Sequence, residues 1–205
     1  MEIVPAIIAY SKEELADKLQ AVQNYVDRVH VDIMDGIFVE NKTIGGVEEI
    51  KNINTNLEFD VHLMVQKPNI EPWLETKASR FLIHAESDAD IISLADKIHK
   101  ANKRVALVFN PETECLTAQV RHVDAVQFMT VHPGNYGGEF IESVLSKIKA
   151  FHNKYPDVKI IVDGAMHHET AKLVKDAGAS EIVIGDHIFN EGRNIKEAIE
   201  ELKNL

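Results

Sequence analysis

Eight short apolar runs recur along this chain of 205 residues, and segments of helical character separate them. These runs are nearly continuous in their apolar character, which is typical of strands that are covered on both faces. Strands that alternate with helices in this way indicate a parallel sheet with helical crossovers. The expected strands are Glu2–Ala9, Val29–Ile33, Leu57–Met64, Phe81–His84, Arg104–Phe109, Ala125–Val131, Lys159–Val162 and Glu181–Ile184.

Eight successive β–α units in 205 residues predict an α/β fold with a single domain, a (β/α)8 TIM barrel of minimal length over residues 1–205. A doubly wound open sheet is the alternative, but no Gly-x-Gly-x-x-Gly motif follows the first strand. The expected helices are Ser11–Asn24, Val47–Ile50, Asn69–Lys77, Asp88–Ala101, Glu112–Val120, Phe140–Tyr155, Glu169–Ala177 and Ile195–Leu202.

Charge and composition restrict the location and the partners of the protein. The net charge of −11 argues against nucleic acid or an anionic membrane as a partner, but it does not exclude a small anionic substrate. No apolar run reaches the length of about 18 residues that a membrane helix needs, and the first residues lack the basic region of a signal peptide. Cys115 is the only cysteine, so no internal disulfide can form. These features predict a cytoplasmic protein.

The second expected strand carries two polar residues that face the same way. Side chains in a strand alternate between its faces, so His30 and Asp32 share one face and Val29, Val31 and Ile33 share the other. An imidazole and a carboxylate two residues apart supply half of a metal site, or an acid/base pair. For this segment alone, a buried structural His beside a surface Asp explains the pattern equally well.

Two other strands supply matching residues. The third expected strand carries Asp60 and His62, again two residues apart, and Asp163 directly follows the seventh. His30, Asp32, His62 and Asp163 all lie towards the carboxyl ends of predicted strands, where barrel enzymes keep their active sites. A shared site is therefore the better explanation of the four residues together.

Four motifs resemble those of the ribulose-phosphate 3-epimerase family. They are HVDIMDG at His30–Gly36, DVHLM at Asp60–Met64, MTVHPG at Met129–Gly134 and VDG at Val162–Gly164. The resemblance covers nearly the whole chain, and the motifs follow one another in the order of the family. Related decarboxylases and hexulose-phosphate synthases would show a lysine-containing Asp-x-Lys-x-x-Asp motif at the second or third strand, and the chain lacks it at both.

The resemblance implies a metal-dependent isomerase that interconverts D-ribulose 5-phosphate and D-xylulose 5-phosphate in the pentose phosphate pathway. By resemblance, His30, Asp32, His62 and Asp163 bind one divalent metal ion, and these nitrogen and oxygen ligands suit Zn²⁺, Fe²⁺, Mn²⁺ or Co²⁺. Asp32 and Asp163 would exchange protons with C3 on opposite faces of an enediolate. Family members are commonly dimers or larger, so the resemblance also implies a homo-oligomer.

The remaining residues implied by the resemblance would contact the substrate. Three methionines at strand ends match methionines that line the family's site, although ordinary core methionines would show the same pattern: Met34, Met64 and Met129. The glycine-rich turns after strands six, seven and eight match the family's phosphate site, which uses backbone amides. The residues in these turns are Gly134, Gly137, Gly164, Ala165, Gly185 and Asp186.

The chain departs from the family pattern mainly around the phosphate site. Tyr136 and Ala165 stand where the family has Gly, Glu139 where it has Lys, Asp186 where it has Ser, and Ala6 where a substrate-contacting Ser is usual. A carboxylate at the phosphate site would repel a dianion unless it turns away or is neutralised. Three hypotheses remain: backbone amides alone bind the phosphate; the substrate is another ketose, with or without phosphate; or the protein binds metal or ligand without turnover. Loss of a metal ligand would favour the last, and all four are present.

Overall fold

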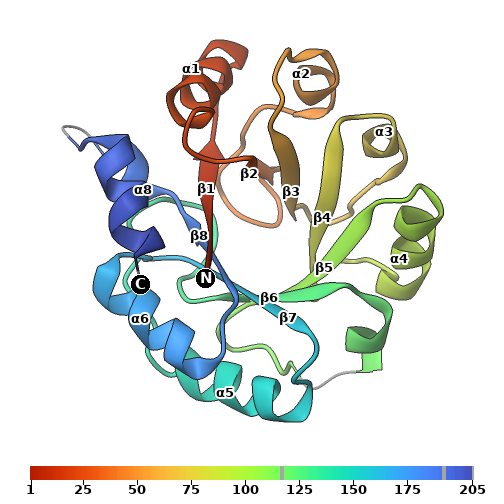
Figure 1. Ribbon diagram of the computed structural model, residues 1–205. Coiled ribbons are helices and arrows are strands. Elements are labelled where there is room, and N and C mark those ends of the chain that lie inside the picture. Colours follow the sequence, from red (N-terminus) through yellow and green to blue (C-terminus); the bar gives the residue numbers. More distant parts are fainter. Residues whose placement is uncertain (116–117, 191–192, 205) are drawn as a thin grey trace.

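Eight strands pair side by side into a closed barrel, with β8 returning to β1 (Figure 1). The computed structural model describes residues 1–115, 118–190 and 193–204. All eight pairings are parallel, which confirms the predicted TIM barrel. The strands are β1 Glu2–Ile8, β2 Arg28–Met34, β3 Glu58–Met64, β4 Ala78–His84, β5 Arg104–Phe109, β6 Ala125–Met129, β7 Lys159–Asp163 and β8 Glu181–Ile184.

The helices surround the barrel and cover the outer face of its strands (Figure 1). Ser11 caps the first of them as predicted, because its hydroxyl accepts a hydrogen bond from the Glu14 amide. The described helices are α1 Lys12–Val22, α2 Val47–Asn52, α3 Glu71–Leu74, α4 Ile91–Lys100, α5 Val144–Lys154, α6 His168–Ala177, α7 Asp186–Phe189 and α8 Ile195–Lys203, with a 3-10 helix, η1, at Ala118–His122.

The helix expected at Glu112–Val120 is wrong over Glu112–Cys115. Its first residues form a turn, and helical structure appears only in η1; residues 116 and 117 lie outside the described chain. The Lys147 ammonium donates hydrogen bonds to the backbone carbonyls of Asn110, Pro111 and Thr113. These contacts hold the turn after β5 in a non-helical path against α5. Periodicity within the segment carries no information about a lysine from a later helix.

The alternation predicted for β2 divides its residues between two environments. Val29, Val31 and Ile33 are buried in the hydrophobic core between the barrel and its helices. His30 and Asp32 point into the barrel. Residues at the carboxyl ends of the strands therefore meet inside the barrel mouth, as the sequence pattern predicts.

The amino ends of the strands enclose a second polar group, which we call the basal ion-pair layer. It consists of Arg28, Asp60, Arg80 and Glu181, and the last three are at most 1% exposed. Arg80 donates hydrogen bonds to both carboxylates, while Arg28 Nη1 lies 3.5 Å from Asp60 Oδ2 and 3.7 Å from Glu181 Oε2. Asp60 therefore belongs to this layer, one layer below His62.

Candidate metal and catalytic centre

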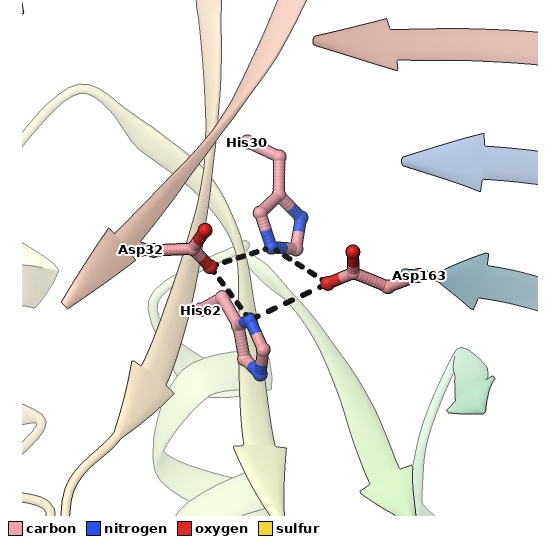
Figure 2. Close-up of side chains that lie close together, drawn as sticks. All are labelled: His30, Asp32, His62 and Asp163. Atoms are coloured by element: carbon pink, nitrogen blue, oxygen red, sulfur yellow. Dashed lines mark hydrogen bonds and ion pairs between the residues drawn. The ribbon is translucent and has the colours of Figure 1, made fainter. Parts of the chain in front are cut away.

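Four side chains from three strands converge at the floor of the barrel mouth (Figure 2). His30 and Asp32 come from β2, His62 from β3, and Asp163 faces them from β7. The pairing of β2 with β3 sets Asp32 beside His62, and Asp32 Oδ1 lies 2.8 Å from His62 Nδ1. One candidate ligand atom from each side chain lies within 4.8 Å of the other three. The structure thus brings together all four residues that the sequence singled out.

The two carboxylates are joined through the histidines rather than to each other. His30 Nε2 lies 3.2 Å from Asp32 Oδ1 and 3.6 Å from Asp163 Oδ2. His62 Nδ1 lies 3.7 Å from the same Asp163 oxygen. Asp163 also accepts a hydrogen bond from Gln127 Nε2 at 3.1 Å. The side chains of Asp32 and Asp163 therefore face each other across the two imidazoles.

The surroundings shift the pKa values of the two carboxyl groups in opposite directions. Burial raises the pKa of Asp32, but the adjacent His30 and His62 more than compensate and lower it below its usual value. Burial raises the pKa of Asp163 to about 6, and the negative charge of Asp32 adds to this shift. Carboxyl groups whose pKa values are driven apart in one site are suited to act as base and acid.

The donor set fits a divalent metal ion. His30 is completely buried, yet neither of its ring nitrogens makes a hydrogen bond to any residue that the structure describes. Buried polar atoms normally have hydrogen-bond partners or bind an ion, and a divalent ion held between His30 and the two carboxylates would supply such a partner. Two imidazoles and two carboxylates without thiolates suit a divalent first-row metal ion.

A cavity of about 450 Å³ opens above the four residues. Asp32, His62 and Asp163 line its floor. The residues predicted to contact the substrate line its walls: Met34, Met64, Met129, Gly134, Gly137, Gly164, Ala165, Gly185 and Asp186. Their roles in binding stay predictions, but the structure places all of them on one cavity.

The turn after β7 keeps an unusual backbone path although one of its residues is not glycine. Gly164 has φ +115°, and a Cβ there would lie 2.5 Å from a methyl carbon of Val131. Ala165 follows with φ +51°, a left-handed conformation that costs a non-glycine residue about 1–2 kcal/mol. The turn therefore retains at Ala165 a conformation that suits the usual Gly, and stores strain next to the site.

Tyr136 crosses the barrel mouth from the loop after β6 to β1. Its hydroxyl donates a hydrogen bond to the Ala6 carbonyl and accepts one from the Ile8 amide, each at 2.8 Å. The pairing of β1 with β8 ends at Pro5, so the hydroxyl occupies a gap where the barrel ladder stops. The ring covers Gly185, where a Cβ would come within 2.2 Å of it. Burial raises the pKa of this phenol, so the side chain stays neutral.

Cationic and titratable residues near Asp186 were not predicted from the sequence. His167, His187 and Arg193 line the same cavity wall, and Arg193 Nη1 lies 2.9 Å from His187 Nε2. His167 is half-buried. These residues lie at the N-cap of α6, in the short helix α7 and in the segment after it, where no long periodic pattern indicates direction. Their proximity to glycine-rich turns is the one signal that could have identified them.

Three further polar residues at strand ends have other surroundings. Among the described residues that line this cavity, none is His84, Asn110 or His132. His132 is exposed and pairs with Glu112, and Asn110 borders a neighbouring pocket. His84 is buried behind His62, with their Nε2 atoms 2.8 Å apart.

The fold and the site together define a TIM-barrel enzyme with its active site at the carboxyl ends of the strands. Residues 2–189 match the family described as the ribulose-phosphate 3 epimerase family. The chain belongs to this family and is therefore an epimerase, an enzyme of the isomerase class.

Relatives named ribulose-phosphate 3-epimerase match the chain over most of their length. A ribulose-phosphate 3-epimerase of Bacillus subtilis (strain 168) is 34% identical, over 99% of this chain and 98% of its own. One from Schizosaccharomyces pombe is 33% identical, over 99% of this chain and 92% of its own. These matches confirm the family resemblance seen in the four sequence motifs.

Solved structures of other enzymes share the fold. The 3-hexulose-6-phosphate synthase of Salmonella typhimurium matches with a TM-score of 0.72 over 100% of this chain and 97% of its own, at 15% identity. The orotidine 5'-monophosphate decarboxylase of Sulfolobus solfataricus matches with a TM-score of 0.67 over 99% and 96%, again at 15% identity. At such low identity, these likenesses support the barrel and not the reaction.

Proposed function

We propose that the protein interconverts D-ribulose 5-phosphate and D-xylulose 5-phosphate by inverting C3. One observation carries the proposal: Asp32 and Asp163 approach the floor of one cavity from β2 and β7, with pKa values shifted in opposite directions. Inversion requires removal of a proton from one face of C3 and delivery of a proton to the other. A flat intermediate between two facing carboxylates meets this requirement.

Each carboxyl group takes one part in the proton transfer. In one direction, ionised Asp32 takes the proton from C3, and the electron pair of that C–H bond moves towards the C2 carbonyl to form an enediolate. Protonated Asp163 then gives its proton to the opposite face of C3, and the C2 carbonyl forms again. The reverse reaction exchanges the two roles, so which Asp is the base depends on the direction of turnover.

The proposed metal ligands are His30, Asp32, His62 and Asp163, whose donor atoms converge. A divalent ion bound there, Zn²⁺, Fe²⁺, Mn²⁺ or Co²⁺, supplies a Lewis acid that stabilises negative charge on the substrate oxygens. The methionines Met34, Met64 and Met129 add polarizable apolar walls that keep water from the reacting carbon.

The phosphate is proposed to bind the backbone amides of the turns after β6, β7 and β8, which include Gly134, Gly137 and Gly164. Asp186 introduces a negative charge on this side of the cavity. Arg193 lines the same cavity, so a cationic side chain is also present on this side. This arrangement supports a phosphorylated substrate despite the departures at Tyr136 and Asp186.

The remaining aspects of the proposed function follow the family. We infer one functional domain over residues 1–205, a role in the pentose phosphate pathway, a cytoplasmic location and a homo-oligomeric state. No helix in the described part of the chain has the length and apolar character needed to cross a membrane. A sugar phosphate, rather than nucleic acid or a membrane, is the expected partner.

The test is deuterium exchange at C3. The protein is loaded in turn with Fe²⁺, Mn²⁺, Zn²⁺ or Co²⁺ and incubated with D-ribulose 5-phosphate in D₂O, and both sugars are followed by NMR. We expect deuterium at C3 together with xylulose 5-phosphate. If folded, metal-bound protein gives no exchange with any metal, the proposed substrate is refuted. The same assay on unphosphorylated ketoses then distinguishes a different epimerase from a relative without turnover.

A further inference from the structure

His84 lies behind one of the proposed metal ligands. It is the last residue of β4, completely buried, and next to His62 on β3. The two rings are inclined by 18°, their centroids lie 4.9 Å apart, and their Nε2 atoms only 2.8 Å apart. Rings that are nearly coplanar and meet at their nitrogen edges share a hydrogen bond rather than a face-to-face stack. Only one of the two nitrogens carries the shared hydrogen.

Glu86 determines which nitrogen of His84 carries a hydrogen. Its Oε2 lies 3.1 Å from His84 Nδ1, and its Oε1 accepts a hydrogen bond from the Asn110 amide at 2.8 Å. An ionised carboxylate can only accept hydrogen bonds, so His84 must donate from Nδ1. In a neutral imidazole the other nitrogen, Nε2, is then an acceptor.

The same reasoning extends one ring further, to His62. Since His84 Nε2 accepts, His62 must donate from its own Nε2. In a neutral His62 imidazole, Nδ1 then has a free electron pair, and this nitrogen faces Asp32 Oδ1 at 2.8 Å and Asp163 Oδ2 at 3.7 Å. The opposite arrangement would leave His84 Nδ1 and the Glu86 carboxylate as two acceptors in contact. An electron pair that faces carboxylate oxygens at this range calls for a cation between them.

We propose that Glu86 and His84 are positioning residues that hold His62 in the tautomer and ring orientation required to bind metal through Nδ1. The chain of contacts runs from Asn110 through Glu86 and His84 to His62, and so from the end of β5 to β3. Residues that orient a metal-binding histidine in this way typically contribute 10–100-fold, roughly, to metal affinity or activity. The inference rests on the metal centre of the proposed function, and not on the identity of its sugar.

The first test measures metal affinity without catalysis. Binding of Mn²⁺ is measured by equilibrium dialysis for the wild type and for the Glu86→Ala, His84→Phe and His84→Gln variants. We expect Glu86→Ala and His84→Phe to weaken binding by about 10–100-fold. His84→Gln retains an amide oxygen that can accept from His62 Nε2, so it should recover part of the loss. The matched control is His99→Gln. His99 lies half-exposed on α4 and pairs with Asp124, so this variant should bind Mn²⁺ as the wild type does.

The second test observes the tautomer directly. With ¹⁵N-labelled histidine, NMR of the metal-free wild type should assign the hydrogen of His62 to Nε2, and Glu86→Ala should yield a mixture of tautomers. This measurement needs no stable His84 variant. Equal Mn²⁺ affinity in the folded Glu86→Ala protein, a neutral wild-type His62 whose single ring hydrogen is on Nδ1, or a wild type that binds no Mn²⁺ would each overturn the proposal. If the affinity losses appear but no sugar is epimerised, the positioning role stands and the proposed function fails.

Discussion

The barrel encloses two buried polar layers, and they are neutralised in different ways. In the basal ion-pair layer, the guanidinium groups of Arg28 and Arg80 balance the carboxylates of Asp60 and Glu181. In the upper layer, formed by His30, Asp32, His62 and Asp163, two carboxylates meet two imidazoles, and no Lys or Arg is among their described ion-pair partners. Asp60 and His62 are only two residues apart on β3, yet one belongs to each layer.

The difference indicates which layer stabilises the fold and which carries the chemistry. A buried carboxylate with a permanent cation beside it needs no further partner. Two buried carboxylates without one raise the free energy of the protein until a proton or a metal ion binds. The upper layer is therefore prepared for an exchangeable cation, whereas the basal layer already contains the cations that neutralise its carboxylates.

The largest expected effect follows from removing a carboxylate of the upper layer. Asp163→Asn should reduce epimerisation by roughly 10²–10⁴-fold, because one of the two proton-transfer groups is lost. The barrel should still fold without loss of stability, since a neutral group replaces a carboxyl group whose pKa burial raises. Turnover and thermal unfolding are measured together, with Asp176→Asn on the outer helix α6 as the control. Full turnover by folded Asp163→Asn would refute the two-carboxylate mechanism.

In the basal layer we expect a substitution to lower stability without lowering activity. Glu181→Gln leaves the buried Arg80 without one of its carboxylate partners and should lower the free energy of unfolding by about 3–5 kcal/mol. The kcat/KM of the folded fraction should not change, because Glu181 does not line the cavity. Denaturant unfolding and initial rates give the two quantities. Glu58→Gln, which breaks the exposed pair with Arg104, is the control and should cost less than about 1 kcal/mol. A rate defect as large as the stability defect would contradict this division of roles.

A bound cation should stabilise the upper layer by an amount that the basal layer does not influence. At a Mn²⁺ concentration of about 100 times Kd, the free energy of unfolding of the wild type should rise by roughly 2.7 kcal/mol. Glu181→Gln should gain the same increment from its lower starting value, while Asp163→Asn should gain much less. Thermal unfolding with Mn²⁺ and with a chelator measures the increments. An equal gain in all three proteins would place the metal elsewhere.

The smallest expected effect is the loss, at low pH, of the contribution that Glu86 makes to the free energy of unfolding. Although burial raises the pKa of Glu86, its hydrogen bonds with His84, Thr113 and the Asn110 amide lower it from 4.5 to about 2. A carboxyl group with a lowered pKa stabilises the folded state above its unfolded pKa, and this contribution is lost as the pH falls. The difference in unfolding free energy between the wild type and Glu86→Gln should therefore shrink from about pH 4.5 towards pH 2. Urea unfolding across this range measures it, and a constant difference would exclude the charge of Glu86 as the cause.

Local periodicity predicted much of the fold and the floor of the site. Alternation along β2 predicted that His30 and Asp32 lie on the same face of the strand, because parity alone decides which residues of a strand share a face. The eight apolar runs, which alternate with helical segments, predicted the barrel. Both inferences use information that lies within a few residues.

Contacts between distant segments could not be predicted in this way. The helix expected at Glu112–Val120 conflicts with carbonyl contacts that come from Lys147 on α5. The sequence identified Tyr136 as a departure from the family pattern, but not its contacts with β1. Arg193 reaches the cavity from a loop in which no regular pattern relates position to direction. These features depend on where whole elements pack and not on local pattern.

The position of Tyr136 has a consequence for the order in which the protein can be completed during synthesis. Its hydroxyl bonds to Ile8 and Ala6, which lie 128 and 130 positions before Tyr136 in the sequence. Both contacts lie next to the place where β1 pairs with β8. A growing chain exposes β1 long before β8 exists to pair with it, and contacts of such separation form late. The Tyr136 loop contacts β1 through its hydroxyl and Gly185 after β8 through its ring, so its packing is completed only when both ends of the chain have come together.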